Sequence, residues 1–347
     1  MAKIDYKEIL DAAWSEHLAS RAANAPTVVS IFAGCGGSSL GYSMAGFREL
    51  LAVEWDIKAA ATFKENFPAV PVFQDDIGKL TINEALSLMG LKQGELDVLD
   101  GSPPCQGFST AGKRVLDDSR NALFQQYARL LEGLKPKVLI MENVSGLVKG
   151  KMKLIFAEIM RALKASGYKV RCQLLNAMHY QVPQSRQRLI FIGVREDLKI
   201  EPSFPKGQTR LISVREAIGH LPVGEAGKHQ KQVLDAWIKC KPGLSLREID
   251  MHVGSYQSVR LNPKKPSRVQ IAMHRNWHWL KPRLLTILET GIIGSFPEQF
   301  KFGKGGFAQI GNSVPPLFMR AIASHVKAIL LKGALLECAR LEALAAP

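Results

Sequence analysis

The order of apolar and polar residues in the first half of the chain predicts strands that alternate with helices. Runs of β-branched and aliphatic residues that are typical of buried strands occur at 27–32, 50–53, 96–99 and 138–141, with a short one just before Asp75. Residues 4–22 have apolar side chains at helical spacing and predict an amphipathic helix. Two later strands, near 169–175 and 189–194, are expected to pair with each other. Strand–helix alternation of this kind predicts an α/β fold with a doubly wound, mostly parallel sheet.

After about residue 200 the pattern changes, because Pro and Gly become frequent and regular periodicity fades. Between residues 219 and 290 there are 12 Lys or Arg against 5 Asp or Glu, and 5 of the 8 histidines. This composition predicts a second, smaller and irregular domain that carries much of the basic surface. From Pro315 onward the sequence is strongly helical to its end.

Composition favours a polyanionic partner. The 347 residues carry a formal charge of +15, and the pI is near 9.6. We expect nucleic acid rather than an anionic membrane surface, because no run of about 18 apolar residues and no signal peptide is found. The five cysteines are widely spaced and never form CxxC, which disfavours a disulfide framework or a zinc site and fits a cytoplasmic protein. His274 and His278 lie four apart without an acid or Cys at ligand spacing, so we interpret them as surface or DNA-facing side chains and expect no metal.

A glycine turn after the first strand, residues 33–41, is typical of a nucleotide site, although a tight turn that binds nothing would look similar. Glu54 ends the second strand about 20 residues later, where an acid binds ribose hydroxyls. Trp55 is placed to stack on adenine, and Asp76 to accept the adenine amino group. These residues indicate an adenosine moiety but do not separate NAD from S-adenosylmethionine.

A candidate nucleophile, Cys105, follows the fourth strand in the run Ser-Pro-Pro-Cys-Gln-Gly-Phe-Ser. The two prolines stiffen its approach, and its polar loop context argues against an inert core cysteine. Glu142 ends the fifth strand, while Arg186 and Arg188 open the last strand pair. A thiol, a carboxylate and guanidinium groups are therefore expected at one edge of the sheet.

This set of groups suits methylation of carbon 5 of cytosine. Addition of a thiolate to carbon 6 makes carbon 5 nucleophilic, an acid at N3 assists the addition, and nearby positive charge favours the thiolate. The target atom is hidden in a duplex, so the base must be flipped out.

The chain resembles the DNA (cytosine-5) methyltransferases of bacterial restriction–modification systems. The motifs that carry this resemblance run in order along nearly the whole chain: Phe32–Gly37, Glu54–Asp56, Asp76–Ile77, Pro103–Ser109, Asp118–Asn121, Glu142–Val144, Gln184–Arg188 and Gln309–Pro316.

The resemblance implies a Rossmann-like S-adenosylmethionine-dependent methyltransferase, with residues 1–200 as catalytic domain, 201–300 as target-recognition domain, and 301–347 as a segment that returns to the catalytic domain. It implies that Cys105 attacks carbon 6, that Glu142 contacts N3 and the amino group, and that Arg188, with Arg186 beside it, orients the base. The cofactor site implied by the family comprises Phe32, Ala33, Gly34, Gly36, Glu54, Trp55, Asp76, Ile77, Pro104, Asn312 and Ser313.

The resemblance also implies duplex DNA as substrate and S-adenosylhomocysteine as product, with a monomeric protein that acts at the nucleoid and has a paired restriction endonuclease as functional partner. The loop at about 106–122 is expected to close over DNA. Candidate DNA contacts are Ser109, Arg120, Arg260, Arg268 and Arg275.

The sequence departs from the family pattern in two places. Ser30 stands where the first motif usually begins with Asp, which puts one cofactor-site contact in doubt. The stretch 284–297 keeps the family's Phe-Pro but lacks its usual Arg-Glu and Ala-Arg-Leu-Gln pattern.

Three alternatives remain. A nicotinamide or flavin oxidoreductase would share the first 80 residues but has no use for the Cys105 loop. A tRNA cytosine-5 methyltransferase usually has a Cys-Phe-Thr run in its second domain, and none is found. A catalytically inactive DNA-binding relative would be expected to lack Cys105, Glu142 or Arg188, and all three are present.

Overall fold

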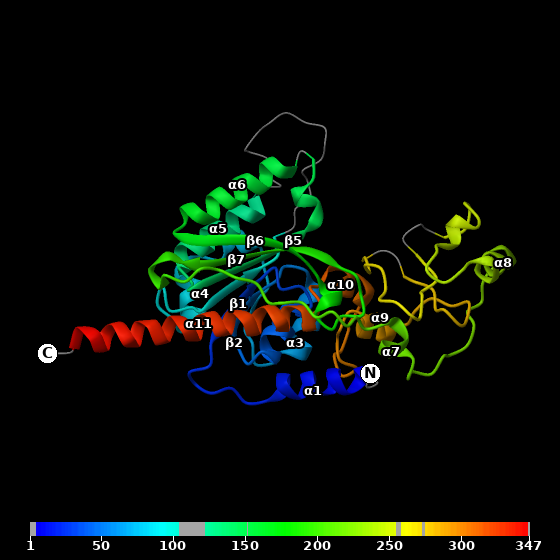
Figure 1. Ribbon diagram of the computed structural model, residues 1–347, viewed down its shortest axis with the longest axis horizontal. Helices are drawn as coiled ribbons and strands as arrows, with labels where there is room; N and C mark the ends of the chain where they lie inside the picture. Colours follow the sequence, from blue (N-terminus) through cyan, green and yellow to red (C-terminus); the bar gives the residue numbers. More distant parts are fainter. Residues whose placement is uncertain (1–4, 104–121, 151, 255–257, 273–274, 346–347) are drawn as a thin grey trace.

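The computed structural model describes residues 5–103, 122–150, 152–254, 258–272 and 275–345. Its centre is a seven-stranded sheet with the order β3-β2-β1-β4-β5-β7-β6 (Figure 1). The strands are β1 Thr27–Ile31, β2 Arg48–Val53, β3 Val72–Phe73, β4 Val98–Gly101, β5 Val138–Val144, β6 Tyr168–Asn176 and β7 Gln187–Arg195. The strands from β3 to β5 are parallel, whereas β7 runs antiparallel to both β5 and β6.

Helices cover both faces of this sheet, because successive strand residues point to opposite sides. Val28 and Val98 belong to one core, and Val29 and Leu99 to the other. The first core is covered by α1 Tyr6–Leu18, α2 Gly37–Met44, α3 Ile57–Asn66 and α11 Pro316–Ala345. The second is covered by α4 Ile82–Met89, α5 Ala122–Leu134 and α6 Met152–Ala165. The predicted doubly wound α/β fold is thus confirmed.

The predicted strands are all present, with shifted ends. β2 begins at Arg48, earlier than expected, because the polar pair Arg48 and Glu49 already lies in register with β1. The expected pairing of the two late strands is confirmed by the antiparallel register of β6 and β7. The N-terminal helix is shorter than predicted and begins at Tyr6, where the Asp5 side chain accepts a hydrogen bond from the Lys7 backbone.

The chain between β7 and α9 is largely irregular, and its portion around α8 forms the part at the right of Figure 1. It contains α7 Val214–Ile218 and α8 Lys231–Lys239. A small separate core lies here, made of Ala236, Trp237, Cys240, Leu246, Val253 and Trp277. In contrast, α7 and α9 Ile287–Ile293 bury residues in the main core, and α10 Gly306–Asn312 follows beside them. Within the described residues, no helix combines the length and the apolar character needed to cross a membrane.

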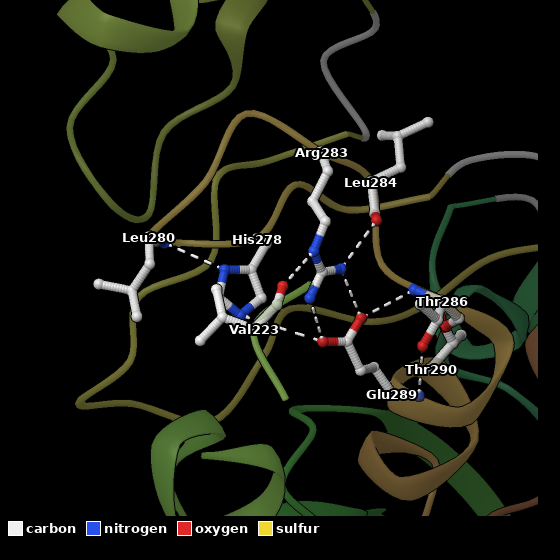
Figure 2. A network of polar contacts seen from close by, with 8 residues as sticks. All are labelled: Val223, His278, Leu280, Arg283, Leu284, Thr286, Glu289 and Thr290. Carbon is white, nitrogen blue, oxygen red and sulfur yellow. Dashed lines mark hydrogen bonds and ion pairs between the residues drawn. The ribbon is translucent and has the colours of Figure 1, made fainter. Parts of the chain in front are cut away.

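The stretch that departs from the family pattern forms α9, and a buried ion pair ties it to the irregular region (Figure 2). Arg283 donates to both carboxylate oxygens of Glu289, at 2.8 and 2.6 Å, and to the Val223 carbonyl at 2.7 Å. Glu289 also accepts from the Thr286 backbone N–H, completing a capping box.

The interpretation of His278 as a surface or DNA-facing side chain is wrong. It is 2% exposed and accepts a hydrogen bond from the Leu280 backbone through Nδ1 (Figure 2). Burial, together with the nearby Arg283 charge, lowers its pKa to about 4, so the ring is neutral at pH 7. His274 lies outside the described residues.

Candidate active site

The glycine turn after β1 adopts a backbone that few residues tolerate. Phe32 has φ of 60° and Gly36 has φ of 97°, both in the left-handed region, and α2 begins at the next residue, Gly37. A Cβ on Gly36 would lie 2.4 Å from a ring carbon of Phe67, so any other residue would displace that ring. The turn therefore brings backbone N–H groups and the N-terminus of α2 to the carboxyl edge of the sheet.

The return segment packs directly against this turn. A Cβ on Gly37 would lie 2.5 Å from the Val314 carbonyl, and Cys35 Sγ lies 3.2 Å from Ser313 Oγ. Ala33 is buried next to them, and Asn312 is exposed. Residues 33–37 and 312–314, nearly 280 positions apart, are thus brought to one place.

The acid at the end of β2 holds the glycine turn. Glu54 is 8% exposed, and its two oxygens accept from the backbone N–H groups of Gly34 at 2.7 Å and Asp56 at 2.8 Å. Burial raises the pKa of Glu54, and these backbone hydrogen bonds oppose the shift. Trp55 is 78% exposed beside it.

Asp76 follows β3, the neighbour of β2, and is also exposed, while Ile77 behind it is buried. Asp76 accepts from the Gly78 N–H at 2.8 Å. An exposed aromatic ring and a carboxylate therefore stand at the ends of adjacent strands.

The predicted catalytic carboxylate and guanidinium meet at the other half of the same edge. Glu142, at the end of β5, and Arg188, at the start of β7, form an ion pair with 2.6 Å between Oε1 and Nε. Both side chains are largely buried, with 10% and 14% exposed. The antiparallel register of β5 and β7 produces this meeting, since it pairs Val144 with Arg188.

Next to Glu142, the Asn143 side chain is buried and donates to the Pro103 carbonyl at 3.4 Å. This bond fixes the end of β5 to the segment that leads from β4 into the Pro-Cys motif. Pro104, Cys105, Ser109 and Arg120 lie outside the described residues.

Arg186 is not part of the Glu142 ion pair. Its guanidinium is 2% exposed and donates to the carbonyls of Gln270 at 3.1 Å and Gly311 at 3.0 Å. Burial and the Arg188 charge lower its pKa to about 9. Arg186 thus joins three segments: β7, the irregular region and the return segment. Neither carbonyl was expected from the sequence as a partner of Arg186, because a backbone acceptor leaves no residue-type signal.

Three other thiols lie among the described residues, and each is a poor nucleophile because its pKa is raised. Burial raises the pKa of Cys35 to about 11, of Cys172 to about 12, and that of Cys240 in the same direction. Among the described residues, no cluster of His, Cys, Asp or Glu is arranged to hold a metal ion.

The three described arginines among the expected DNA contacts differ in their surroundings. Arg260 lies 3.7 Å above the Trp237 ring and donates to the carbonyls of Trp237, Cys240 and Trp279, so the fold uses it internally. Arg268 is exposed. Arg275 is also exposed and lies over the Phe307 ring.

Comparison with known proteins places these features in one family. The family described as C-5 cytosine-specific DNA methylase matches residues 26–328. The type II methyltransferase M1.HphI of Haemophilus parahaemolyticus is 37% identical over 326 residues, covering 86% of each chain. M.XorII of Xanthomonas oryzae is 32% identical over 367 residues, covering 88% of this chain and 86% of the relative.

Solved structures agree. A DNA modification methyltransferase encoded within a prophage of E. coli superposes with a TM-score of 0.77 at 26% identity, covering 88% of this chain and all 100% of the other. A DNMT2 of Spodoptera frugiperda, with a TM-score of 0.65 at 18% identity, shares the fold over 89% of this chain and 99% of its own. The chain therefore belongs to the C-5 cytosine-specific DNA methylase family and is a DNA (cytosine-5) methyltransferase of the restriction–modification type.

Proposed function

We propose that this enzyme methylates a flipped-out cytosine within a short duplex sequence, through a covalent bond between Cys105 and carbon 6. The observation that carries the proposal is the Glu142–Arg188 ion pair, which stands beside the Asn143–Pro103 bond at the entrance to the Cys105 motif. A carboxylate and a guanidinium are then held where a cytosine ring, once flipped out, would present N3 and its substituents.

The residues of the glycine turn suit S-adenosylmethionine as methyl donor, with S-adenosylhomocysteine as product. Glu54 retains free lone pairs for ribose hydroxyls, because each oxygen accepts one backbone hydrogen bond. Trp55 offers a free ring face for adenine, and the N-terminus of α2 suits a carboxylate. Phe32, Asp76, Ile77, Pro104, Asn312 and Ser313 would complete the site. When bound, the cofactor supplies an activated methyl group.

The residues of this chain would act in sequence. The Cys105 thiolate forms the bond to carbon 6, and the electron pair displaced from the ring becomes available at carbon 5. Glu142 holds a proton at N3 and accepts from the exocyclic amine, while Arg188 keeps Glu142 in place and contacts the base. After methyl transfer, a solvent base accepts the carbon 5 proton, the electrons of that bond restore the ring double bond, and the sulfur–carbon bond breaks to leave the Cys105 thiolate. Glu142 takes back the N3 proton.

For the partner, we propose that the basic region within 201–300 reads duplex DNA. The separate core of Trp237 and its neighbours supports a recognition unit narrower than that range, since α7 and α9 pack in the main core. Arg268 and Arg275, with Ser109 and Arg120, are the proposed contacts, and Arg260 would act through the fold of that unit. We further propose a monomer that acts in the bacterial cytoplasm and has a functionally paired endonuclease.

The test is replacement of the nucleophile. Cys105→Ala is expected to abolish methyl transfer to duplex DNA while isothermal titration still shows cofactor binding. Cys172→Ala is the matched control, because Cys172 lies on β6 away from the site and its thiol is suppressed. Full activity of Cys105→Ala would contradict the mechanism.

A second measurement detects the covalent step. Duplex DNA with 5-fluorocytosine at the target position, incubated with cofactor, should leave a denaturation-resistant adduct that mass spectrometry places on Cys105. Transfer to tRNA but not to duplex DNA would instead support the alternative substrate.

A further inference from the structure

The sheet contains a buried carboxyl group that the reaction above does not use. Asp100 lies on β4 and is 2% exposed. Burial, and then the neighbouring Glu49 charge, raise its pKa to about 8. Burying a carboxyl group costs free energy unless hydrogen bonds replace those that it made to water. The groups that face Asp100 therefore determine how much this burial costs.

Among the described residues, the hydroxyl groups that face Asp100 lie on α2. Tyr42 donates its hydroxyl to Asp100 Oδ1 at 3.3 Å, and the Ser38 hydroxyl lies near the same carboxyl group, where it opposes the rise in the pKa. Ser38 and Tyr42 are four residues apart, so they lie one above the other on the side of α2 that faces the sheet. Asp100 therefore accepts a hydrogen bond from this helix at Tyr42 and lies beside its first turn at Ser38.

That first turn is part of the proposed cofactor site. Gly36 and Gly37 open α2, and the backbone there has almost no free space, since a Cβ on Gly37 would lie 2.5 Å from the Val314 carbonyl. A small shift or rotation of α2 would thus move the N–H groups of the glycine turn.

Ser30 explains why the acid can reside on β4. The parallel register pairs Ser30 directly with Asp100, and both side chains point to the α2 face. On its other side, Ser30 adjoins Glu49, and the Ser39 hydroxyl donates to Glu49 at 2.8 Å and lies 3.3 Å from the Ser30 hydroxyl. An Asp at position 30, as the family's first motif usually has, would put three carboxyl groups side by side in the core.

We propose that Asp100 is a positioning residue of the cofactor site, which anchors the first turn of α2, and that Ser30 is its necessary complement. The family usually has a carboxyl group at this place on β1, whereas this chain has one on the adjacent strand, β4. This inference rests on the proposed cofactor site, and it adds to that site a residue that does not contact the cofactor.

The first experiment compares two substitutions of nearly the same volume. Asp100→Asn keeps an acceptor for Ser38 and Tyr42, whereas Asp100→Leu keeps none. Titration with S-adenosylhomocysteine should give a dissociation constant within about threefold of the wild type for Asn and at least about tenfold weaker for Leu. The KM for the cofactor should rise in the Leu variant, while the KM for DNA and kcat at saturating cofactor stay unchanged.

Tyr127→Phe is the matched control. Tyr127 is equally buried and donates to the Ile140 carbonyl at 3.1 Å, but it fixes α5 on the opposite face of the sheet. It should leave cofactor affinity unchanged. A wild-type affinity in Asp100→Leu would overturn the proposal, as would an equal loss of affinity in Tyr127→Phe. Absence of cofactor binding by the wild type itself would overturn the cofactor assignment first, and this proposal with it.

A reciprocal exchange tests the role of Ser30 even if Asp100→Leu fails to fold. Ser30→Asp and Asp100→Ser should each weaken cofactor binding, one by adding a third acid and the other by removing the anchor. The double variant S30D/D100S, which again has two acids on this face, should bind more tightly than either single variant. Additive losses in the double variant would overturn the complementarity of the two positions.

Discussion

Glu142 and Arg188 form an ion pair at the carboxyl edge of the sheet, and each is largely removed from solvent. Replacing Glu142 by Gln keeps the shape but removes the group that we propose holds a proton at N3. We expect kcat to fall by about 10²- to 10⁴-fold, the usual contribution of general acid–base catalysis, with DNA binding changed only slightly. Single-turnover kinetics would measure this loss.

Glu201→Gln is the control for that experiment, because Glu201 pairs with Lys169 at 2.6 Å but is exposed and lies away from the site. It should have wild-type kinetics. If Glu142→Gln were as active as Glu201→Gln, Glu142 would have no part in the chemistry.

The buried acids also predict how stability depends on pH. Burial raises the pKa of Glu49 to about 7 and of Asp100 to about 8, from ordinary values of 4.5 and 3.8. The unfolded chain releases these protons at lower pH than the folded chain does. The acids therefore favour folding most at low pH, and this contribution is lost as the pH rises through the ordinary values toward about 8.

The window from pH 6.5 to 8 isolates this effect. Below it, the half-buried His17 and the buried His278, whose pKa values burial lowers to about 4, change stability in the opposite direction. Urea unfolding should show that stability falls with pH in the wild type and falls less in an Asp100→Asn variant, by at most about 1.4 kcal/mol per pH unit. Equal slopes in both proteins would contradict the raised pKa of Asp100.

At the residue scale, the sequence predicted which groups come together but not all of their partners. Glu142 and Arg188 could be expected at one edge, since each adjoins a strand end. The internal use of Arg186 and Arg260 could not be predicted, because backbone carbonyls receive both guanidinium groups. The burial of His278 depends in the same way on the packing of a region without periodicity.

At the element scale, α9 shows how an atypical sequence can keep a structural role. Its Glu289 caps the helix and holds Arg283, and the two side chains are 4% and 10% exposed. Glu289→Gln leaves a buried guanidinium with its charge unpaired, so we expect a loss of about 3–5 kcal/mol in the free energy of unfolding. Urea denaturation would measure it.

Asp197→Asn is the comparison, because Asp197 also pairs with an arginine, Arg195 at 2.8 Å, but is 59% exposed. Its loss should cost less than about 1 kcal/mol. Similar costs for the two substitutions would show that burial of the Arg283–Glu289 pair has little energetic effect.

The strands of the sheet and the helices that cover it could be predicted, because their apolar residues repeat with a clear period. Only the ends of these elements differ from the prediction. The region between α7 and α9 gave no such signal. Its small core is assembled around Trp237 and Trp277, 40 residues apart, and is bridged by Arg260 rather than by regular strands.

At the scale of the whole molecule, the net charge of +15 predicts DNA binding that weakens with salt. Arg268→Ala and Arg275→Ala are expected to reduce the slope of log K against log salt by about 1 for each phosphate contact removed. Arg260→Ala should instead lower stability, since its guanidinium is bound within the fold. Fluorescence anisotropy over a salt series would distinguish them, and unchanged slopes in both exposed-arginine variants would exclude these residues as phosphate contacts.

Arg186 limits which part of the proposed recognition region can be exchanged. One guanidinium fixes the carbonyls of Gln270 and Gly311, and a Cβ on Gly311 would lie 2.3 Å from the Ala272 nitrogen. Recombination that replaced everything between β7 and α9 with the segment of a relative would exchange the Gln270 carbonyl and the Ala272 backbone that meet Arg186 and Gly311. Chimaeras that keep residues 267–272 and exchange only the chain around the small core should remain folded. A change of target sequence is therefore expected to require exchange of that inner segment alone.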